Sequence, residues 1–335
     1  MKNHKGPAGL TRRDALKRIV QGVTAAAVMP RLFSSAIDKV RIIRVESDRV
    51  WKGEQRDPEV VAAMINRGIM ALTGKTTADE AWKSLFSSFQ HVGLKINLLG
   101  RPRVYTACEV ADAVTAGLVL AGVKGENIVV WDRPESHFGL TAYKLGRGKH
   151  GERIEAGGCY SFCYKNSRSY VETSGCGDLP VDLIPLTRTE ATINLPVLKD
   201  HGIAGVTGAL KNIAFGCYHT IPQAHDDHCD PFIAEACQGF TAVNPIPLIV
   251  LDATQGCFAG GPVPSNSSAI WKENAVYLAT DPVALDRVCC LKIAAKRRAA
   301  GLPDVTPMAK HIETAAAKGL GVADAGRIDV ITLRV

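Results

Sequence analysis

Segments typical of strands alternate with segments typical of helices along most of this chain. Short runs rich in Val, Ile and Leu stand at 39–47, 91–99, 127–132, 181–187, 191–198, 246–254 and 327–335. Apolar residues recur at helical spacing at 57–74, 108–123, 206–216 and 281–301. This order is typical of a parallel sheet covered by helices. We therefore predict an α/β fold: a largely parallel or mixed sheet with helices on both faces.

Residues 146–180 interrupt this alternation. They are rich in Gly, Ser, Tyr and Cys and show little apolar periodicity. We predict a Cys-rich irregular insertion or lid here, within a single α/β domain that spans 37–335. Asp57 and Asp281, each followed by Pro, are predicted to cap the helices at 57–74 and 281–301.

Residues 1–36 have the layout of an export signal. A basic region contains the pair Arg12–Arg13, a short apolar run follows at 19–29, and small residues at 34–36 suit cleavage after Ala36. This order predicts export by the twin-arginine translocase to the periplasm. The alternative is a basic amphipathic helix. The apolar run is too short for a stable membrane span, and no span is expected in the mature chain.

The positive charge of the chain belongs mostly to that segment. The formal net charge is +7, and residues 1–36 hold seven basic residues and one acidic residue, a net +6. The remainder is therefore near +1, which gives no argument for nucleic acid as a partner.

Polar residues stand near the ends of several predicted strands. They are Lys95, Asn97, Asp132, Lys199, Asp200, His201 and Asp252. In parallel α/β sheets, ligands bind beyond the carboxyl ends of the strands. We therefore expect these side chains to line one pocket.

Four motifs follow one another along the chain: GLKINLL at 93–99, NLPVLKDHGIAGVTGALKN at 194–212, IVLDATQGCFAGGP at 249–262 and ATDPVALDRV at 279–288. In this order they resemble the domain-of-unknown-function 362 family. The resemblance assigns no activity. It implies export signals in many members and ferredoxin-like cysteine clusters in some. The C-x2-C-x2-C-x3-C run of such clusters is absent here, so an iron–sulfur role does not carry over.

Lysines in the longest motif indicate an anion site. A buried ammonium costs several kcal/mol without a partner. We expect Lys95, Lys199 and Lys211 to hold a carboxylate or phosphate, and Asn97 and Asn212 to donate amide hydrogen bonds. The alternative is an internal ion-pair network with Asp200, Asp252 and Asp281.

Two further residues complete this predicted catalytic set. His201 is a candidate general acid or base or a metal ligand, and the alternative is a structural histidine. Asp252 is the carboxylate expected in the pocket.

The segment CYHTIPQAHDDHCDP at 217–231 concentrates metal-ligating side chains. We predict a transition-metal site, zinc or iron, formed by His219, His225, His228 and Cys229, with Asp226 as an alternative addition. The spacing matches no regular zinc finger. A polar loop with disulfide-bonded cysteines is the competing interpretation.

The remaining cysteines favour disulfides. Cys159, Cys163 and Cys176 fall in the predicted insertion, and an exported chain would pair them with Cys217, Cys229 or Cys237. An iron–sulfur cluster held by Cys159, Cys163, Cys176 and Cys217 is the less favoured alternative. The glycine-rich segment 256–262 lacks a nucleotide-binding pattern.

These patterns together predict an exported, metal-dependent enzyme that acts on a small anionic substrate by hydrolytic or redox chemistry. The alternatives are a non-catalytic binding protein for an anionic metabolite or a metal, and an iron–sulfur electron carrier.

Overall fold

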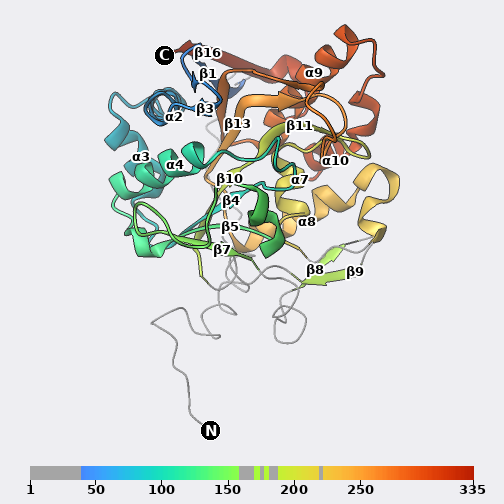
Figure 1. Cartoon of the computed structure of the whole chain (residues 1–335). Coiled ribbons are helices and arrows are strands. Elements are labelled where there is room, and N and C mark those ends of the chain that lie inside the picture. The colour runs from blue at the N-terminus through green and yellow to red at the C-terminus, as the bar shows by residue number, and fades with distance from the viewer. Residues whose placement is uncertain (1–38, 158–169, 174–176, 181–187, 219–221) are drawn as a thin grey trace.

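A large mixed sheet runs through the molecule between two layers of helices (Figure 1). The computed structural model describes residues 39–157, 170–173, 177–180, 188–218 and 222–335. The predicted α/β class is confirmed. The predicted export signal at 1–36 and the predicted strand at 181–187 lie outside the described residues.

The strands of the main path follow one order across the sheet. They are β16 (Ile328–Arg334), β1 (Val40–Glu46), β15 (Ala275–Ala279), β13 (Leu248–Cys257), β10 (Ala191–Leu195), β4 (Val92–Ile96), β5 (Ile128–Asp132), β7 (Arg153–Ala156) and β6 (Gly146–Arg147). Shorter strands are β11 (Val197–His201), β12 (Gly205–Val206) and β14 (Ile270–Trp271), and two hairpins are β2 (Trp51–Lys52) with β3 (Gln55–Arg56) and β8 (Tyr170–Thr173) with β9 (Gly177–Pro180).

Most of the sheet is parallel. β13, β10, β4, β5 and β7 pair in parallel, and so do β1 and β16. β15 runs antiparallel to both of its neighbours, β1 and β13. The carboxyl ends of β13, β10, β4 and β5 therefore meet at one edge of the sheet, where ligands bind in folds of this type.

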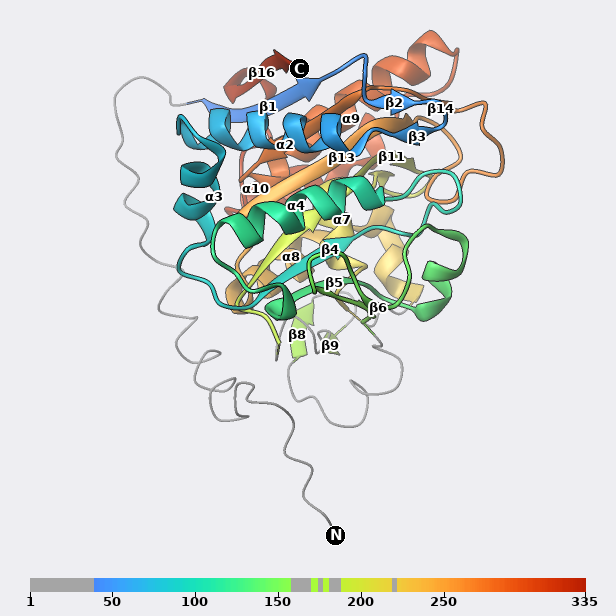
Figure 2. The same cartoon turned by 60° about the vertical axis from the view of Figure 1, so that its left-hand side comes forward.

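The helices divide between the two faces of the sheet. One face carries α2 (Pro58–Thr73), α3 (Ala78–Phe86) and α4 (Cys108–Leu120), which Figure 2 shows in front of the sheet. The other carries α7 (Gly208–Ala214), α8 (Phe232–Val243), α9 (Pro282–Ala299) and α10 (Lys310–Ala317). Short 3-10 segments are η1 (Gly125–Asn127), η2 (Glu135–Leu140), η3 (Pro222–Cys229, with a kink at residues 226–228), η4 (Thr306–Met308) and η5 (Ala325–Arg327). No helix among the described residues is long and apolar enough to cross a bilayer.

Both predicted helix caps are confirmed. The Asp57 carboxylate accepts the backbone N–H of Glu59 at 2.9 Å, and the Asp281 carboxylate accepts that of Ala284 at 2.8 Å. A proline follows each cap, which suits the first helical position because its missing N–H would have no partner there.

The segment 146–180 is less irregular than predicted where it is described. β7 joins the main sheet beside β5, and β8 and β9 form a separate hairpin. β7 reads RIEA and is half-buried, so it lacks the apolar alternation from which strands are predicted. Residues 158–169 and 174–176 lie outside the described part of this segment.

Alternation along β4 determines which face carries polar groups. Val92, Leu94 and Ile96 pack in the core with α2 and α4. Successive side chains of a strand point to opposite faces, so Lys95 points toward the layer that contains α7. The sheet thus presents a lysine to the helix that carries Lys211 and Asn212.

Candidate anion-binding site

Three lysines from neighbouring elements of the fold are buried. Lys95 of β4 is 1% exposed, Lys199 of β11 is 0% exposed and Lys211 of α7 is 5% exposed. Burial is the condition under which an ammonium needs a partner. The contacts of each lysine therefore decide what the site can do.

Lys95 has a carboxylate partner. Its Nζ lies 2.7 Å from Oδ1 of Asp132, the last residue of β5, and 2.5 Å from the Ile96 carbonyl. Asp132 also accepts the backbone N–H groups of Leu98 and Arg133 at 2.8 and 2.9 Å. Burial raises the pKa of Asp132, but Lys95 and the other donors outweigh it and hold the pKa well below its usual range. Asp132 is therefore an anion at every physiological pH.

A chain of side-chain amides connects Lys199 to α7. Lys199 Nζ donates to Asn97 Oδ1 at 2.8 Å, and Asn97 Nδ2 donates to Asn212 Oδ1 at 2.9 Å. Asn212 Nδ2 donates to Asn194 Oδ1 at 2.7 Å, and Asn194 Nδ2 to the Ala209 carbonyl at 2.9 Å. The asparagines lie beside the lysines as predicted, but these amide hydrogens are donated within the protein.

Lys211 has a weaker set of contacts. Its Nζ lies 3.9 Å from the Cys229 thiol and 3.0 Å from the centroid of the Phe215 ring. Burial lowers the pKa of Lys211 to about 7, and the positive charges of Lys199 and Arg133 contribute in the same direction. Burial likewise lowers the pKa of Lys199 to about 8. Within the described ranges, neither ammonium group forms an ion pair with a carboxylate, and Lys199 has only an amide oxygen as its hydrogen-bond acceptor.

The carboxylates predicted as alternative partners of the lysines serve other groups. Asp252 accepts the backbone N–H of Ala107 at 2.9 Å and that of Thr254 at 2.9 Å. Its contact with Ala107 holds the start of α4, and the role expected for Asp252 in the pocket stays a prediction. Asp200 accepts the Gly261 N–H at 2.9 Å.

His201 is held in one tautomer. Its Nδ1 accepts the backbone N–H groups of Ile203 and Ala204, both at 3.2 Å. A nitrogen that accepts these bonds carries the lone pair, so the proton of the neutral ring sits on Nε2. Burial, followed by the charge of Lys211, lowers the pKa of His201 to about 2. These contacts leave the neutral ring with its Nε2–H group as a hydrogen-bond donor, and the acid–base or metal-binding role expected for His201 stays a prediction.

His137 was not predicted as a site residue. Its Nδ1 lies 3.4 Å from Asp132 Oδ2, and its side chain is partly exposed. A carboxylate that faces one imidazole nitrogen orients the other for proton transfer. No motif pointed to this pair, because His137 stands in the 3-10 turn η2 after the strand end.

A family model described as domain of unknown function (DUF362) matches residues 92–291. The chain belongs to the DUF362 family. The DUF362 match includes all three lysines and the asparagines, whereas β1, α2, α10 and β16 lie outside it. No curated protein matches the chain.

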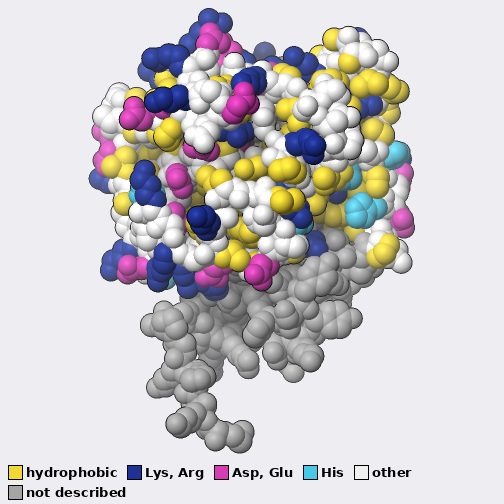
Figure 3. All heavy atoms as spheres, in the orientation of Figure 1, with side chains coloured by type: hydrophobic (Ala, Val, Ile, Leu, Met, Phe, Trp, Pro, Cys, Tyr) yellow, Lys and Arg dark blue, Asp and Glu magenta, His cyan; other side chains and the backbone are white. Residues whose placement is uncertain are grey.

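The predicted metal ligands of this DUF362 protein are only partly described. The His225 ring packs 4.7 Å from Phe215, and His228 Nδ1 lies 2.8 Å from the Ile203 carbonyl. Histidine side chains gather on the right-hand side of the view in Figure 3. His219 lies outside the described residues, and among those described no three His, Cys, Asp or Glu side chains gather as a metal site. The described residues do not supply a complete ligand set by themselves.

Cysteines of the DUF362 chain are mostly buried thiols where they are described. Cys229 and Cys237, two of the predicted disulfide partners, are thiols, and Cys237 Sγ donates to the Leu210 carbonyl at 3.1 Å. Cys217 is buried just after α7. Cys159, Cys163 and Cys176 lie outside the described residues, so the predicted cluster stays a prediction.

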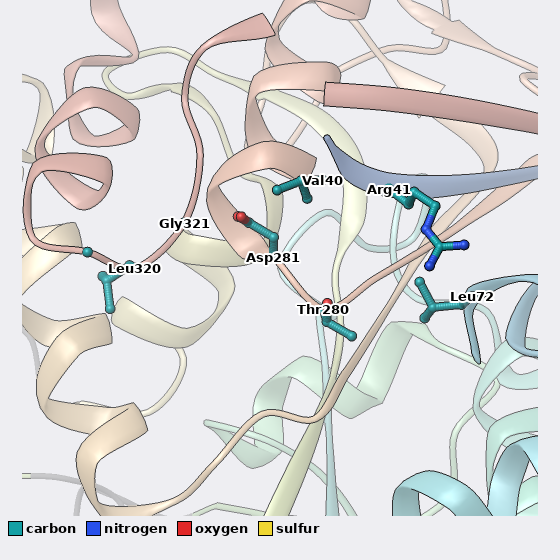
Figure 4. Close-up of a pocket in the computed structure, with 8 residues that line it drawn as sticks. Val40, Arg41, Leu72, Thr280, Asp281, Leu320 and Gly321 are labelled. Carbon is teal, nitrogen blue, oxygen red and sulfur yellow. The ribbon is translucent and has the colours of Figure 1, made fainter. Parts of the chain in front are cut away.

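A hollow of about 400 Å³ lies at the end of the sheet opposite to the carboxyl ends of β13, β10, β4 and β5. Figure 4 shows Arg41 and Leu72 on one side of it and Asp281 on the other. It is lined by the first residues of β1 and by Thr280, which follows β15. It is separate from the three buried lysines of the DUF362 motifs, none of which lines it.

Proposed function

We propose that this DUF362 protein binds a small anion between its buried lysines and acts on it as an enzyme. One observation carries the proposal. Three lysines are at most 5% exposed, and Asp132 is the only carboxylate hydrogen-bonded to any of them within the described residues. An anionic ligand would supply the missing negative charge.

The energetics favour this reading. An isolated buried ammonium costs several kcal/mol, which folding must offset elsewhere. Among the residues that the structure describes, Lys199 donates to one amide oxygen and Lys211 to one thiol, which leaves N–H groups of both for a ligand. A bound anion would accept those hydrogens and raise both lysine pKa values again.

The groups around the lysines suit chemistry as well as binding. An ammonium at a dry site stabilises negative charge that develops on an oxygen atom. A lysine with a pKa near neutrality can also exchange a proton with a substrate. The neutral His201 ring would add a hydrogen bond from Nε2 without adding charge.

The sequence adds an export route and a metal to the proposal. The enzyme would be exported by the twin-arginine route, because Arg12–Arg13, an apolar run and small residues occur in order. It would use zinc or iron, held by His219, His225, His228 and Cys229, because these ligand types are concentrated in one segment. No step above depends on the metal.

Replacing Lys199 by Met tests the anion site directly. We expect K199M to fold and to bind its best small anion at least about tenfold more weakly, because a desolvated charged contact is worth more than 1.4 kcal/mol. Titration calorimetry with phosphate, sulfate, acetate and glycolate measures this. The control is K83M, since Lys83 is 52% exposed and pairs with Asp79 on α3. Parent-like affinity in a folded K199M protein would refute the site.

The same proteins separate an enzyme from a binding protein. An enzyme should convert an organic anion that it binds, and K199M should lose conversion together with affinity. If binding requires Lys199 but mass spectrometry detects no product from any bound anion, the non-catalytic alternative is supported.

A further inference from the structure

His311 is a buried histidine that has no hydrogen-bond partner among the residues that the structure describes. It lies on α10 and is 0% exposed, and neither ring nitrogen has a partner within the described part of the chain. A neutral imidazole carries one donor and one acceptor. Buried polar groups are almost always paired, and an unpaired one needs an explanation such as a bound ligand.

Its surroundings place it beside the Lys211 half of the site. Burial lowers the pKa of His311 to about 3, and Lys211 contributes in the same direction, so the ring is neutral. α10 also contacts the segment that carries Cys229, whose thiol contacts Lys211. Lys310 Nζ lies 2.5 Å from Asp227 and Thr314 Oγ1 lies 3.0 Å from Asp230, on either side of the Cys229 thiol that contacts Lys211.

The groups on this side of the site differ in what they offer a ligand. A bound anion holds Lys211 as an ammonium, which offers only donors, and the neutral His201 ring offers the Nε2–H donor. His311 adds an acceptor nitrogen as well as a donor. A ligand that satisfies all three must therefore present oxygen atoms and also one hydroxyl hydrogen.

We propose that His311 contacts the bound anion and selects oxyanions that carry a hydroxyl group, such as hydrogen phosphate or a 2-hydroxycarboxylate. This inference rests on the proposed anion site. Sulfate and simple carboxylates have no proton to donate at neutral pH, so they leave the acceptor nitrogen of His311 unpaired. Sites built to hydrogen-bond a hydroxyl discriminate strongly against analogues that lack it.

Two matched pairs of anions test the selection. Phosphate is compared with sulfate, and glycolate with acetate, by calorimetry at pH 7 and constant ionic strength. Within whichever pair binds, we expect the anion with a hydroxyl group to bind at least about tenfold more tightly than the anion without one. In H311L this preference should disappear while the affinity of the other member stays unchanged. H311Q is the matched control, because glutamine keeps a donor and an acceptor.

Thermal unfolding of the variants separates a ligand contact from a structural role. H311L removes two unpaired polar groups, so its Tm should equal or exceed that of the parent. Equal affinities within both pairs, or a preference that persists in H311L, would overturn the inference and leave the Lys199 result standing. A lower Tm with unchanged affinities would show that an internal water serves His311. If none of the four anions binds the parent, the proposed function fails as well.

Discussion

Lys199 and Lys211 show how burial converts ordinary side chains into groups that respond near neutral pH. Burial lowers the pKa of Lys199 to about 8 and that of Lys211 to about 7. An unfolded lysine has a pKa near 10.4, so the unfolded chain binds more protons between pH 7 and 10. Stability of the unliganded protein should therefore rise with pH across this window as far as these two groups determine it.

Anion affinity should change in the opposite direction. An anion binds the charged lysines, so above pH 7 binding must take up a proton at Lys211 and then at Lys199. We expect the affinity for sulfate, which does not titrate here, to fall by up to about tenfold per pH unit for each deprotonated lysine. Calorimetry from pH 6 to 9 at fixed ionic strength measures this. A permanently charged K211R variant should show a shallower decline, and constant affinity in the parent would contradict the prediction.

Candidate site residues could be chosen from the sequence, but most of their hydrogen-bond partners could not. Lys95, Lys199, Asn97 and Asn212 could be chosen because cations and amides stood after apolar strands. The contact of Asn194 with Asn212 needed the strand register, in which Asn194 lies beside Lys95. His311 could not be found, because nothing in the sequence around it distinguishes it from a helix residue in the core.

At the scale of elements, α7 positions the site through its two ends. The Asp286 carboxylate on α9 accepts the N–H groups of Ala209 and Leu210 at 2.5 and 3.0 Å. Gly208 has a φ of +54°, and a Cβ there would lie 2.1 Å from Asp286, so glycine is required. Beyond the last turn, Gly216 packs against Lys95. The helix therefore depends on close approaches that larger residues would prevent.

Substitution of Gly216 tests this dependence. A Cβ at Gly216 would lie 2.2 Å from the Asn212 carbonyl and 2.4 Å from Lys95 Cε. We expect G216A to lower the free energy of unfolding by about 1–3 kcal/mol and to weaken anion binding, because Lys95 must shift from Asp132. Urea denaturation and calorimetry measure both. In the control G139A, the new Cβ meets no atom within 4 Å, and the change should stay within about 0.5 kcal/mol. Equal stability of G216A and G139A would contradict the account.

Secondary structure was predictable where periodicity was long and strong. The helices α2, α4 and α9 and the strands β4, β10 and β13 all fall in segments identified from apolar pattern. β15 was missed because its five residues, AVYLA, are too short and uniformly apolar to indicate a strand rather than a helix. α8 and α10 were also missed. Because α10 was not predicted, His311 was not identified as a site residue.

At the scale of the whole molecule, the site extends beyond the DUF362 match. The lysines stand within residues 92–291, whereas α10 lies outside and supplies His311 together with the Lys310–Asp227 ion pair. The strands β4 and β11 supply Lys95 and Lys199, and α7 in the helical layer on one face supplies Lys211. Anion affinity should therefore depend on the intact chain and not on the matched segment alone.

Export and metal content are tested together on the full chain. We expect the parent to accumulate in the periplasm and R12K/R13K to remain in the cytoplasm, with R18K as the control outside the pair.

The periplasmic protein should contain about one zinc or iron and no acid-labile sulfide, since the predicted ligands are mainly histidines. Replacing His225 and His228 by Ala should remove the metal. Acid-labile sulfide would instead support a cysteine-held cluster, and metal that survives both replacements would refute the histidine set.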